Sequence, residues 1–215
     1  MLKHIGSNWT ISALRLITMI WLTPFILDRL GPDSNGVWVT IVSMTGFLSL
    51  FVMGVPMSTV KHIAEHLARG DTDKANRAIG TSAGISFGLA GVALCVSGPL
   101  YLAFESGLLE SERWASLDEE TLGHARLAWW IVTAQVCAGF VMRLPLAIFD
   151  AHRDFITRNF LLAGALILRV ALVLGLLTWR PTITALALCP LGVLIFEWAG
   201  AMLLIRWRHK GVRFS

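Results

Sequence analysis

Three ionisable residues lie inside long hydrophobic stretches of this 215-residue chain: Arg15, Arg169 and Glu197. An ionisable side chain at membrane depth is costly, and it usually faces a bundle interior or a water-filled cavity. A guanidinium group stays charged and can donate two parallel hydrogen bonds to a phosphate or carboxylate. We therefore predict that Arg15 and Arg169 line a hydrated, cationic cavity that attracts an anionic headgroup, with Glu197 as the acid at a similar depth.

The same three residues also permit a purely structural interpretation. Counted from the turn at 180–182, Arg169 and Glu197 differ in depth by roughly 6 Å, a gap that two long side chains can close. Such a pair would simply lock the fifth and sixth hydrophobic stretches together. Arg15 lies near the depth of Glu197, so the glutamate has two candidate arginine partners. With one acid for two bases, the interior would keep a net positive charge.

The sequence has no arrangement of residues typical of catalysis, a cofactor or a metal site. His62 and His66 are spaced for one helix face, but no third ligand accompanies them, and a solvated face is the better interpretation. The three cysteines, Cys95, Cys137 and Cys189, match neither a metal spacing nor a disulfide framework. We predict no enzyme activity, no cofactor and no metal.

Composition places the chain in a membrane. Hydrophobic residues make up 55% and charged residues 15%, and the mean hydropathy is +0.67, whereas a soluble domain carries about 25% charged residues. The formal net charge of +4 fits basic cytoplasmic loops, and we predict no nucleic-acid partner.

A helix needs about 20 apolar residues to cross the hydrocarbon layer. By this criterion we predict an all-α membrane protein with six transmembrane helices, in a single domain over residues 1–215. The predicted spans are about 9–27, 37–60, 78–104, 127–149, 159–179 and 181–205. Prolines predict kinks near Pro56 and Pro190, and the glycines at 80, 84, 88 and 91 predict a face for close helix packing within the chain.

The loops predict the orientation and the helix ends. With the N-terminus in the cytoplasm, twelve lysines and arginines lie on the inner side and four on the outer side, a clear positive-inside bias. Both termini are then cytoplasmic. Gly70 predicts a helix stop at an inner turn, with Asp71 or Thr72 as the cap of the next helix, and Ser116 with Glu119 predicts a capping box before the fourth helix.

Four segments resemble a known family of transporters. Residues 8–16, 25–31 (FILDRLG) and 36–38 (GVW), followed by 63–71 (IAEHLARGD), are similar to the opening of polysaccharide biosynthesis flippases. These are O-antigen and exopolysaccharide translocases of the multidrug/oligosaccharidyl-lipid/polysaccharide exporter superfamily. An arginine in the first helix, as at Arg15, is common in that family. The likeness covers residues 5–90 best, and Asn35 stands where the family usually has tyrosine.

The resemblance implies a fold and a function. Such proteins have two six-helix lobes around a central cavity, and they flip lipid-pyrophosphate-linked oligosaccharides from the inner to the outer leaflet of the bacterial inner membrane. This chain corresponds to the N-terminal lobe, and the second lobe is absent from it. Its expected partners are the lipid-linked anionic oligosaccharide, membrane lipids, and the missing lobe or a second copy of the chain.

Three alternatives remain open. A multidrug or cation antiporter lobe of the same superfamily would need several buried acids, and only Glu197 qualifies. A membrane scaffold without transport activity would not require the buried charges. An intramembrane enzyme would need converging catalytic groups at membrane depth, and the sequence provides none.

Overall fold

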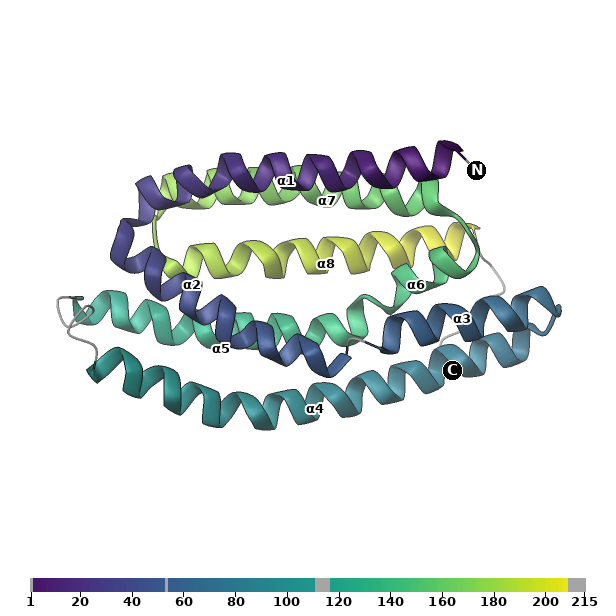
Figure 1. Cartoon of the computed structure of the whole chain (residues 1–215), viewed down its shortest axis with the longest axis horizontal. Helices are drawn as coiled ribbons and strands as arrows, with labels where there is room; N and C mark the ends of the chain where they lie inside the picture. The colour runs from purple at the N-terminus through teal and green to yellow at the C-terminus, as the bar shows by residue number, and fades with distance from the viewer. Residues whose placement is uncertain (1, 53, 111–116, 209–215) are drawn as a thin grey trace.

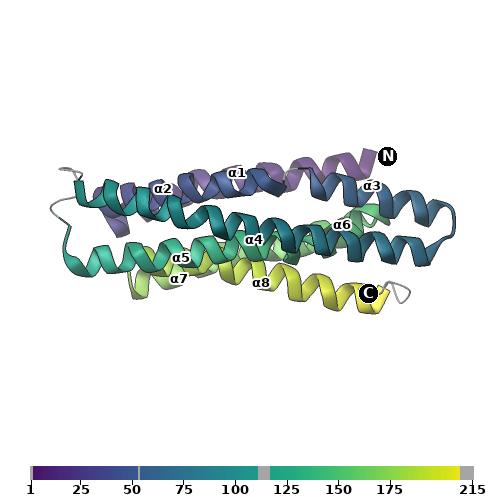
Figure 2. The same ribbon diagram turned by 90° about the horizontal axis from the view of Figure 1, so that it is seen from below.

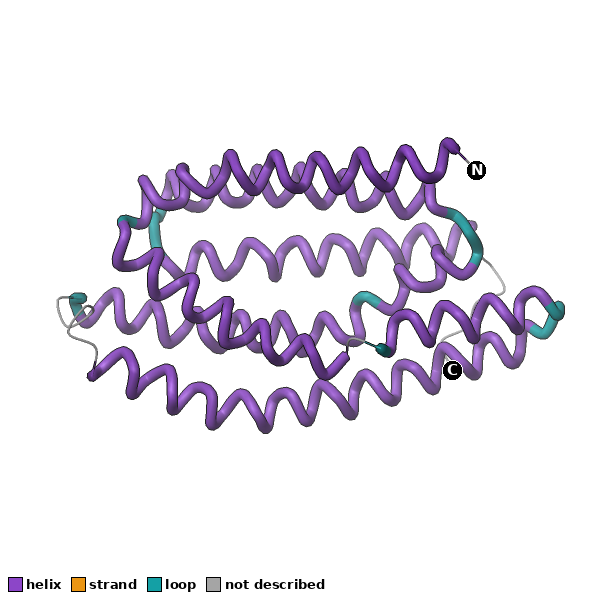
Figure 3. Tube along the Cα trace, in the orientation of Figure 1, coloured by secondary structure: helices purple, strands orange, loops and turns teal. Residues whose placement is uncertain are grey.

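The computed structural model describes residues 2–52, 54–110 and 117–208, and every regular element in these ranges is a helix (Figure 3). The helices are α1 (Leu2–Leu30), α2 (Pro32–Gly46), the short 3₁₀ helix η1 (Phe47–Val52), α3 (Val55–Ala68), α4 (Thr72–Glu110), α5 (Glu119–Met142), α6 (Leu144–Ala151), α7 (Phe155–Trp179) and α8 (Ile183–Arg208).

The helices run back and forth between two ends of the molecule (Figure 1). One end holds the start of α1, the α3–α4 turn, the α6–α7 turn and the end of α8; the other end holds the α1–α2 and α7–α8 turns (Figure 1). By length and composition, five helical stretches in the described residues can each cross a membrane: Pro32–Ala68, Thr72–Gly107, Glu119–Ala151, Phe155–Trp179 and Ile183–Arg208. The chain is therefore an all-helical, multi-pass membrane protein, and α1 adds a further helix of 29 residues.

Two of the predicted spans are broken rather than continuous. The second predicted span divides into α2, η1 and α3, and α3 begins at Gly54–Pro56, where the sequence predicts a kink. The fourth ends as α5 at Met142 and resumes as α6, with Pro145 in its first turn. Proline lacks the N–H that would continue the hydrogen-bond ladder, so each break falls just before a proline. Pro190, by contrast, lies inside α8, which is helical throughout.

The predicted helix stop and cap between α3 and α4 are confirmed. Gly70 has φ +73°, a conformation that glycine adopts without strain. The Asp71 carboxylate accepts a hydrogen bond from the Lys74 backbone N–H at 3.0 Å and pairs with the Lys74 ammonium at 2.8 Å. These hydrogen bonds, that of the Lys74 side chain foremost, hold the pKa of Asp71 below its ordinary value.

At the start of α5 the N-cap differs from the prediction. The helix begins at Glu119, and Asp118 is its N-cap residue. The neighbouring Thr121 side chain, as the largest influence, lowers the pKa of the Asp118 carboxyl, but the Asp118 side chain makes no hydrogen bond to the helix backbone. The cap is thus two residues later than a Ser116 capping box would place it, and Ser116 itself lies outside the described residues.

The helices form two sides of a bundle (Figure 2). On one side α8 packs against both α5 and α7. The helices of the other side pack against that side: α1 packs against α7, and α2 packs against α5. The third helix, α3, packs against α4 and α6. In Figure 1, α8 is therefore seen between the α1–α7 pair and the α2–α5 pair. We call the side of α7 and α8 that lies opposite their exposed apolar residues the inner face; those residues are Phe160, Ile167, Leu188 and Ile195.

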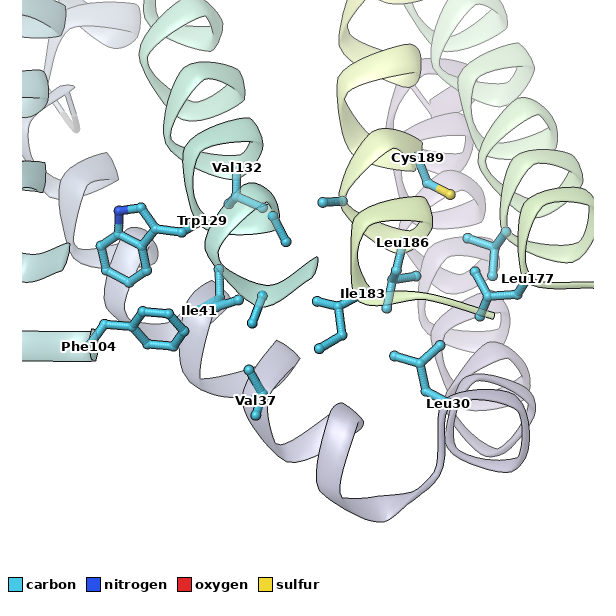
Figure 4. Packing of buried hydrophobic residues seen from close by; sticks show 14 of the residues in the cluster. Leu30, Val37, Ile41, Phe104, Trp129, Val132, Leu177, Ile183, Leu186 and Cys189 are labelled. Atoms are coloured by element: carbon cyan, nitrogen blue, oxygen red, sulfur yellow. The ribbon is translucent and has the colours of Figure 1, made fainter. Parts of the chain in front are cut away.

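The largest buried cluster lies near the α1–α2 and α7–α8 turns (Figure 4). Phe104 of α4 stacks on Trp129 of α5 with ring centroids 4.9 Å apart. Around them lie Val37, Ile41, Ile183 and Leu186, and further residues come from α1 and α7. Because lipid tails are as apolar as these side chains, the cluster stabilises the bundle through close packing rather than through removal from water.

Glycines allow close packing at the α7–α8 interface, and not along α4 as the sequence predicts. A Cβ at Gly84, Gly88 or Gly91 of α4 would meet no other atom within 4 Å, so these three glycines pack against no other helix in the described part of the chain. The stripe of α4 that is buried carries Ser82, Ser86, Ala93 and Ser97 instead. The α7–α8 contact, in contrast, places Leu161 of α7 directly over Gly200 of α8.

Gly200→Ala should destabilise the protein through this contact. The new Cβ would lie 2.6 Å from Leu161 Cδ1, so the buried leucine must move, at a cost of about 1–3 kcal/mol. Gly139→Ala is the matched control, because its Cβ would meet Leu194 Cδ2 only at 3.9 Å. Thermal unfolding in detergent should give a lower midpoint for Gly200→Ala than for Gly139→Ala. Equal midpoints would show that α7 and α8 are not held this closely.

Candidate functional site

Arg15 lies on the side of α1 that packs against the bundle. Leu22, seven residues further along and thus on the same helix face, is buried. On the opposite face, Ile17 and Ile20 are 63% and 73% exposed. Arg15 itself is exposed, as is Met19 one turn further along, so this part of the face is open.

Arg169 lies on the inner face of α7. The opposite face of α7 carries Phe160 and Ile167, which are 80% and 71% exposed and form the apolar outer surface. Arg158 lies about three turns before Arg169 on the same face. Arg169 is exposed, and it interacts electrostatically with Cys189 of α8. It therefore lies at the junction of α7 and α8.

Glu197 lies on the inner face of α8. The exposed apolar residues Leu188 and Ile195 are on the opposite face. Glu197 is half-buried, and the cations that act on it electrostatically are, in decreasing order, Arg143, Arg15 and Arg158. These three come from the α5–α6 junction, α1 and α7, so Glu197 faces the space that these elements surround.

The structure brings together only part of the predicted set. Phe196 approaches Gly164, which sets Glu197 level with the part of α7 between Arg158 and Arg169, and Arg15 acts on Glu197 electrostatically. In the described part of the chain, no ion pair within 4.0 Å involves Arg15, Arg169 or Glu197. The structural lock between Arg169 and Glu197 is thus not formed, and these charges keep their hydrogen-bonding capacity.

Sequence reasoning missed two arginines of this site, Arg143 and Arg158. Arg143 was counted as an inner-side charge at the end of a span, but the break before Pro145 places it at a junction inside the helical stretch 119–151. Its Nε lies 4.0 Å from the position of a Cβ on Gly139, close to Leu194 of α8. The side chain thus points back along α5, toward the turn of α8 that precedes Glu197.

Arg158 is anchored by a neighbouring acid. Its Nε lies 3.3 Å from Asp150 Oδ1 of α6, and both atoms are shielded from solvent. Next to this pair, the Asp154 carboxylate accepts hydrogen bonds from the backbone N–H and the hydroxyl of Thr157. Arg208 of α8 donates to the Thr157 hydroxyl and lies 3.5 Å from Asp154. These contacts tie the start of α7 to α6 and to the end of α8.

The electrostatic character of the inner face is cationic. Around Glu197 it presents three arginines, and Arg169 lies further along α7. Guanidinium groups in this arrangement suit a multivalent oxyanion such as a phosphate. No cluster of three or more histidine, cysteine, aspartate or glutamate side chains that could hold a metal ion occurs among the described residues.

Comparison with known proteins places the chain no more narrowly than its fold does. No protein-family model, curated protein or solved structure matches it. Fold and site together define a multi-pass helical membrane protein whose inner face carries arginines.

Proposed function

We propose that this chain forms one six-helix lobe of a flippase that moves a lipid-pyrophosphate-linked anionic oligosaccharide from the inner to the outer leaflet of a bacterial inner membrane. The observation that carries the proposal is the position of the membrane-depth arginines. Arg15 and Arg169 lie on helix faces opposite exposed apolar residues, in a membrane-spanning bundle. Charges on those faces are available to a polar ligand and are kept away from lipid tails.

The chemistry of the substrate explains why such a face is needed. A sugar headgroup cannot cross lipid unaided, because each hydroxyl stripped of water costs several kcal/mol without replacement hydrogen bonds. The arginines supply hydrogen bonds and charge to the pyrophosphate while the lipid tail stays in the bilayer. An inside-negative potential favours outward movement of an anion by about 2.3 kcal/mol per charge per 100 mV.

The proposal includes an orientation and a partner. Both termini lie in the cytoplasm, in accordance with the distribution of lysine and arginine, and the ends of α1 and α8 lie at one end of the bundle (Figure 1). A second lobe or a second copy of the chain completes the cavity opposite the inner face. Alternating access then follows from rocking of the two lobes against each other, with a proton or sodium gradient as the driving force.

A cation antiporter of similar architecture is a weaker candidate. It would require the inner face to attract positive charge, whereas Glu197 is outnumbered by the arginines that act on it. A scaffold without transport activity leaves the inward-facing charges without a role. Neither alternative accounts for Arg15, Arg143 and Arg169 having no ion-pair partner among the described residues.

Translocation in proteoliposomes tests the proposal. The full chain is reconstituted into vesicles with a fluorescently labelled prenyl-diphosphate oligosaccharide, and the fraction of label accessible to an external quencher is followed over time. We expect a membrane potential to accelerate the change in accessibility relative to protein-free vesicles. Exchange of an organic cation with no movement of the labelled lipid would favour the antiporter, and the absence of both movements would refute transport by this chain.

A further inference from the structure

Four side chains form a patch where the end of α4 meets the start of α5, and we call it the α4–α5 patch: Tyr101, Glu105, Arg126 and Trp130. Arg126 Nε lies 3.1 Å from Glu105 Oε1, and the rings of Tyr101 and Trp130 have centroids 5.2 Å apart. Each helix contributes two residues four positions apart, which share one helix face. The patch thus combines a charged pair and an aromatic pair, one helical turn apart.

The aromatic pair is supported by the buried core. Tyr101 also contacts Trp129, with ring centroids 5.9 Å apart, and Trp129 in turn stacks on Phe104 (Figure 4). Both Trp129 and Phe104 are buried. Tyr101 is therefore held between two indole rings, and little further ordering is needed when a ligand binds.

The other side of the patch is accessible from outside the bundle. Trp130 is 44% exposed, and the side chains of Arg126 and Glu105 are 39% and 27% exposed. The end of α4 and the start of α5 lie at the end of the bundle that holds the α1–α2 and α7–α8 turns (Figure 1). In the proposed orientation this is the outer side of the membrane, at the level of the polar headgroups.

The chemistry of the patch suits a sugar ring. A pyranose has C–H groups on its faces and hydroxyls around its edge, so it can stack on an indole while polar side chains bind its hydroxyls. A guanidinium group has five N–H donors and a carboxylate has two acceptor oxygens, so the contact between Arg126 Nε and Glu105 Oε1 leaves hydrogen-bonding capacity on both residues. Because Arg126 neutralises Glu105, a cationic ligand gains no net attraction, although aromatic rings can bind cations elsewhere.

We propose that the α4–α5 patch binds a neutral pyranose unit of an oligosaccharide, with Trp130 as the stacking surface and with Glu105 and Arg126 bound to adjacent hydroxyls. The inference rests on the proposed function and adds to it a site for the sugar. This site lies on helices other than α1 and α7, which carry Arg15 and Arg169. The headgroup of a lipid that has reached the outer leaflet can therefore be bound there while the membrane-depth arginines are free.

Binding to the purified full chain tests the site, in a detergent without a sugar headgroup. The probes are maltopentaose, mannopentaose and chitopentaose, each free and linked to a prenyl diphosphate, with the prenyl diphosphate alone as reference. Saturation-transfer NMR measures the free sugars, and native mass spectrometry measures the lipid-linked forms. We expect at least one saccharide to bind with a dissociation constant of about 1 mM or lower.

Substitutions assign that binding to the patch. Trp130→Leu removes the stacking surface and should raise the dissociation constant by about tenfold, whereas Trp130→Phe keeps an aromatic face and should raise it by no more than about threefold. Glu105→Gln/Arg126→Gln leaves the net charge unchanged and should also weaken binding by about tenfold, because the charge-assisted hydrogen bonds to the hydroxyls are lost.

Trp179→Leu is the matched control. Trp179 is 74% exposed at the same end of the bundle, and Arg180 lies 5.3 Å from the centroid of its ring. In the described residues no carboxylate pairs with that arginine within 4.0 Å, so this tryptophan has the arginine without the acid. Saccharide binding by Trp179→Leu should equal that of the wild type.

Weakening by Trp130→Leu but not by Trp179→Leu supports the proposal, and weakening for the lipid-linked forms alone identifies these as the ligand. Unchanged binding in Trp130→Leu, or binding of none of the saccharides, overturns it and leaves Trp130 as an anchor at the membrane interface. The result is independent of translocation. Saccharide binding at the patch without lipid movement would keep the site and refute the flippase, whereas lipid movement with unchanged binding in Trp130→Leu would refute the site alone.

Discussion

Replacing Arg15 and Arg169 together with glutamine should reduce translocation of the lipid-linked anionic oligosaccharide to the rate seen in protein-free vesicles. Arg15 and Arg169 come from α1 and α7, which pack against each other, and both face away from the apolar outer surface. Glutamine retains hydrogen-bonding capacity but loses the charge that offsets the diphosphate. Neither arginine has an ion pair to lose in the described residues, so the variant should insert and fold normally.

The matched control is Arg180→Gln/Arg206→Gln, which also removes two arginines. Arg180 follows the end of α7 and stacks on Trp179, 5.3 Å from its ring centroid, and Arg206 is exposed in the last turn of α8. Translocation by this control should stay within about twofold of the wild type, and circular dichroism should show equal helix content for both variants. Undiminished translocation by the Arg15/Arg169 variant would refute the assignment of these residues to the substrate pathway.

Arg158→Met should lower the free energy of unfolding by about 2–3 kcal/mol. The replacement leaves the Asp150 carboxylate without its partner, although its Oδ1 atom is shielded from solvent. Removing one member of a buried pair costs about 3–5 kcal/mol, and we lower this figure because about a quarter of each side chain remains exposed. Equilibrium unfolding in mixed detergent micelles measures the loss.

A second substitution separates this pair from general packing. Asp150→Asn/Arg158→Met removes both charges, so most of the stability lost in Arg158→Met should return. Arg153→Met serves as the control, because Arg153 lies exposed in the α6–α7 turn nearby. Equal losses in the single and double variants would show that Arg158 stabilises the protein through its aliphatic part alone.

Hydrophobic length predicted the helical fold well, because the cost of unsatisfied backbone groups in lipid forces each apolar stretch into a helix. The inner turn at Gly70 and Asp71 was predicted from local properties: glycine adopts a positive φ, and aspartate accepts a hydrogen bond at a helix start. The positions at which helices break were harder to predict. The break at Gly54–Pro56 was predicted. The break at Arg143 was not, although Pro145 in the first turn of α6 accounts for it.

The charged site was predicted in part. Hydropathy singles out Arg15, Arg169 and Glu197, because each interrupts an apolar stretch, but depth alone does not give the rotation of a helix about its axis. In the structure Phe196 approaches Gly164, so Glu197 lies level with the part of α7 between Arg158 and Arg169, yet no ion pair within 4.0 Å joins it to either arginine in the described residues. The glycine stripe of α4 was wrongly assigned to packing for a related reason: spacing shows that small residues share a face, but not that another helix covers that face.

The close contact of α7 and α8 has an electrical consequence. Leu161 rests on Gly200 and Leu172 approaches Gly192, so the two helices are expected to tilt as one piece. This unit includes Arg158, Arg169 and Glu197. Its tilt would therefore move a net charge of about +1 through part of the membrane field. A tilt without cargo would therefore already produce a transient current, and a bound diphosphate would reverse its sign.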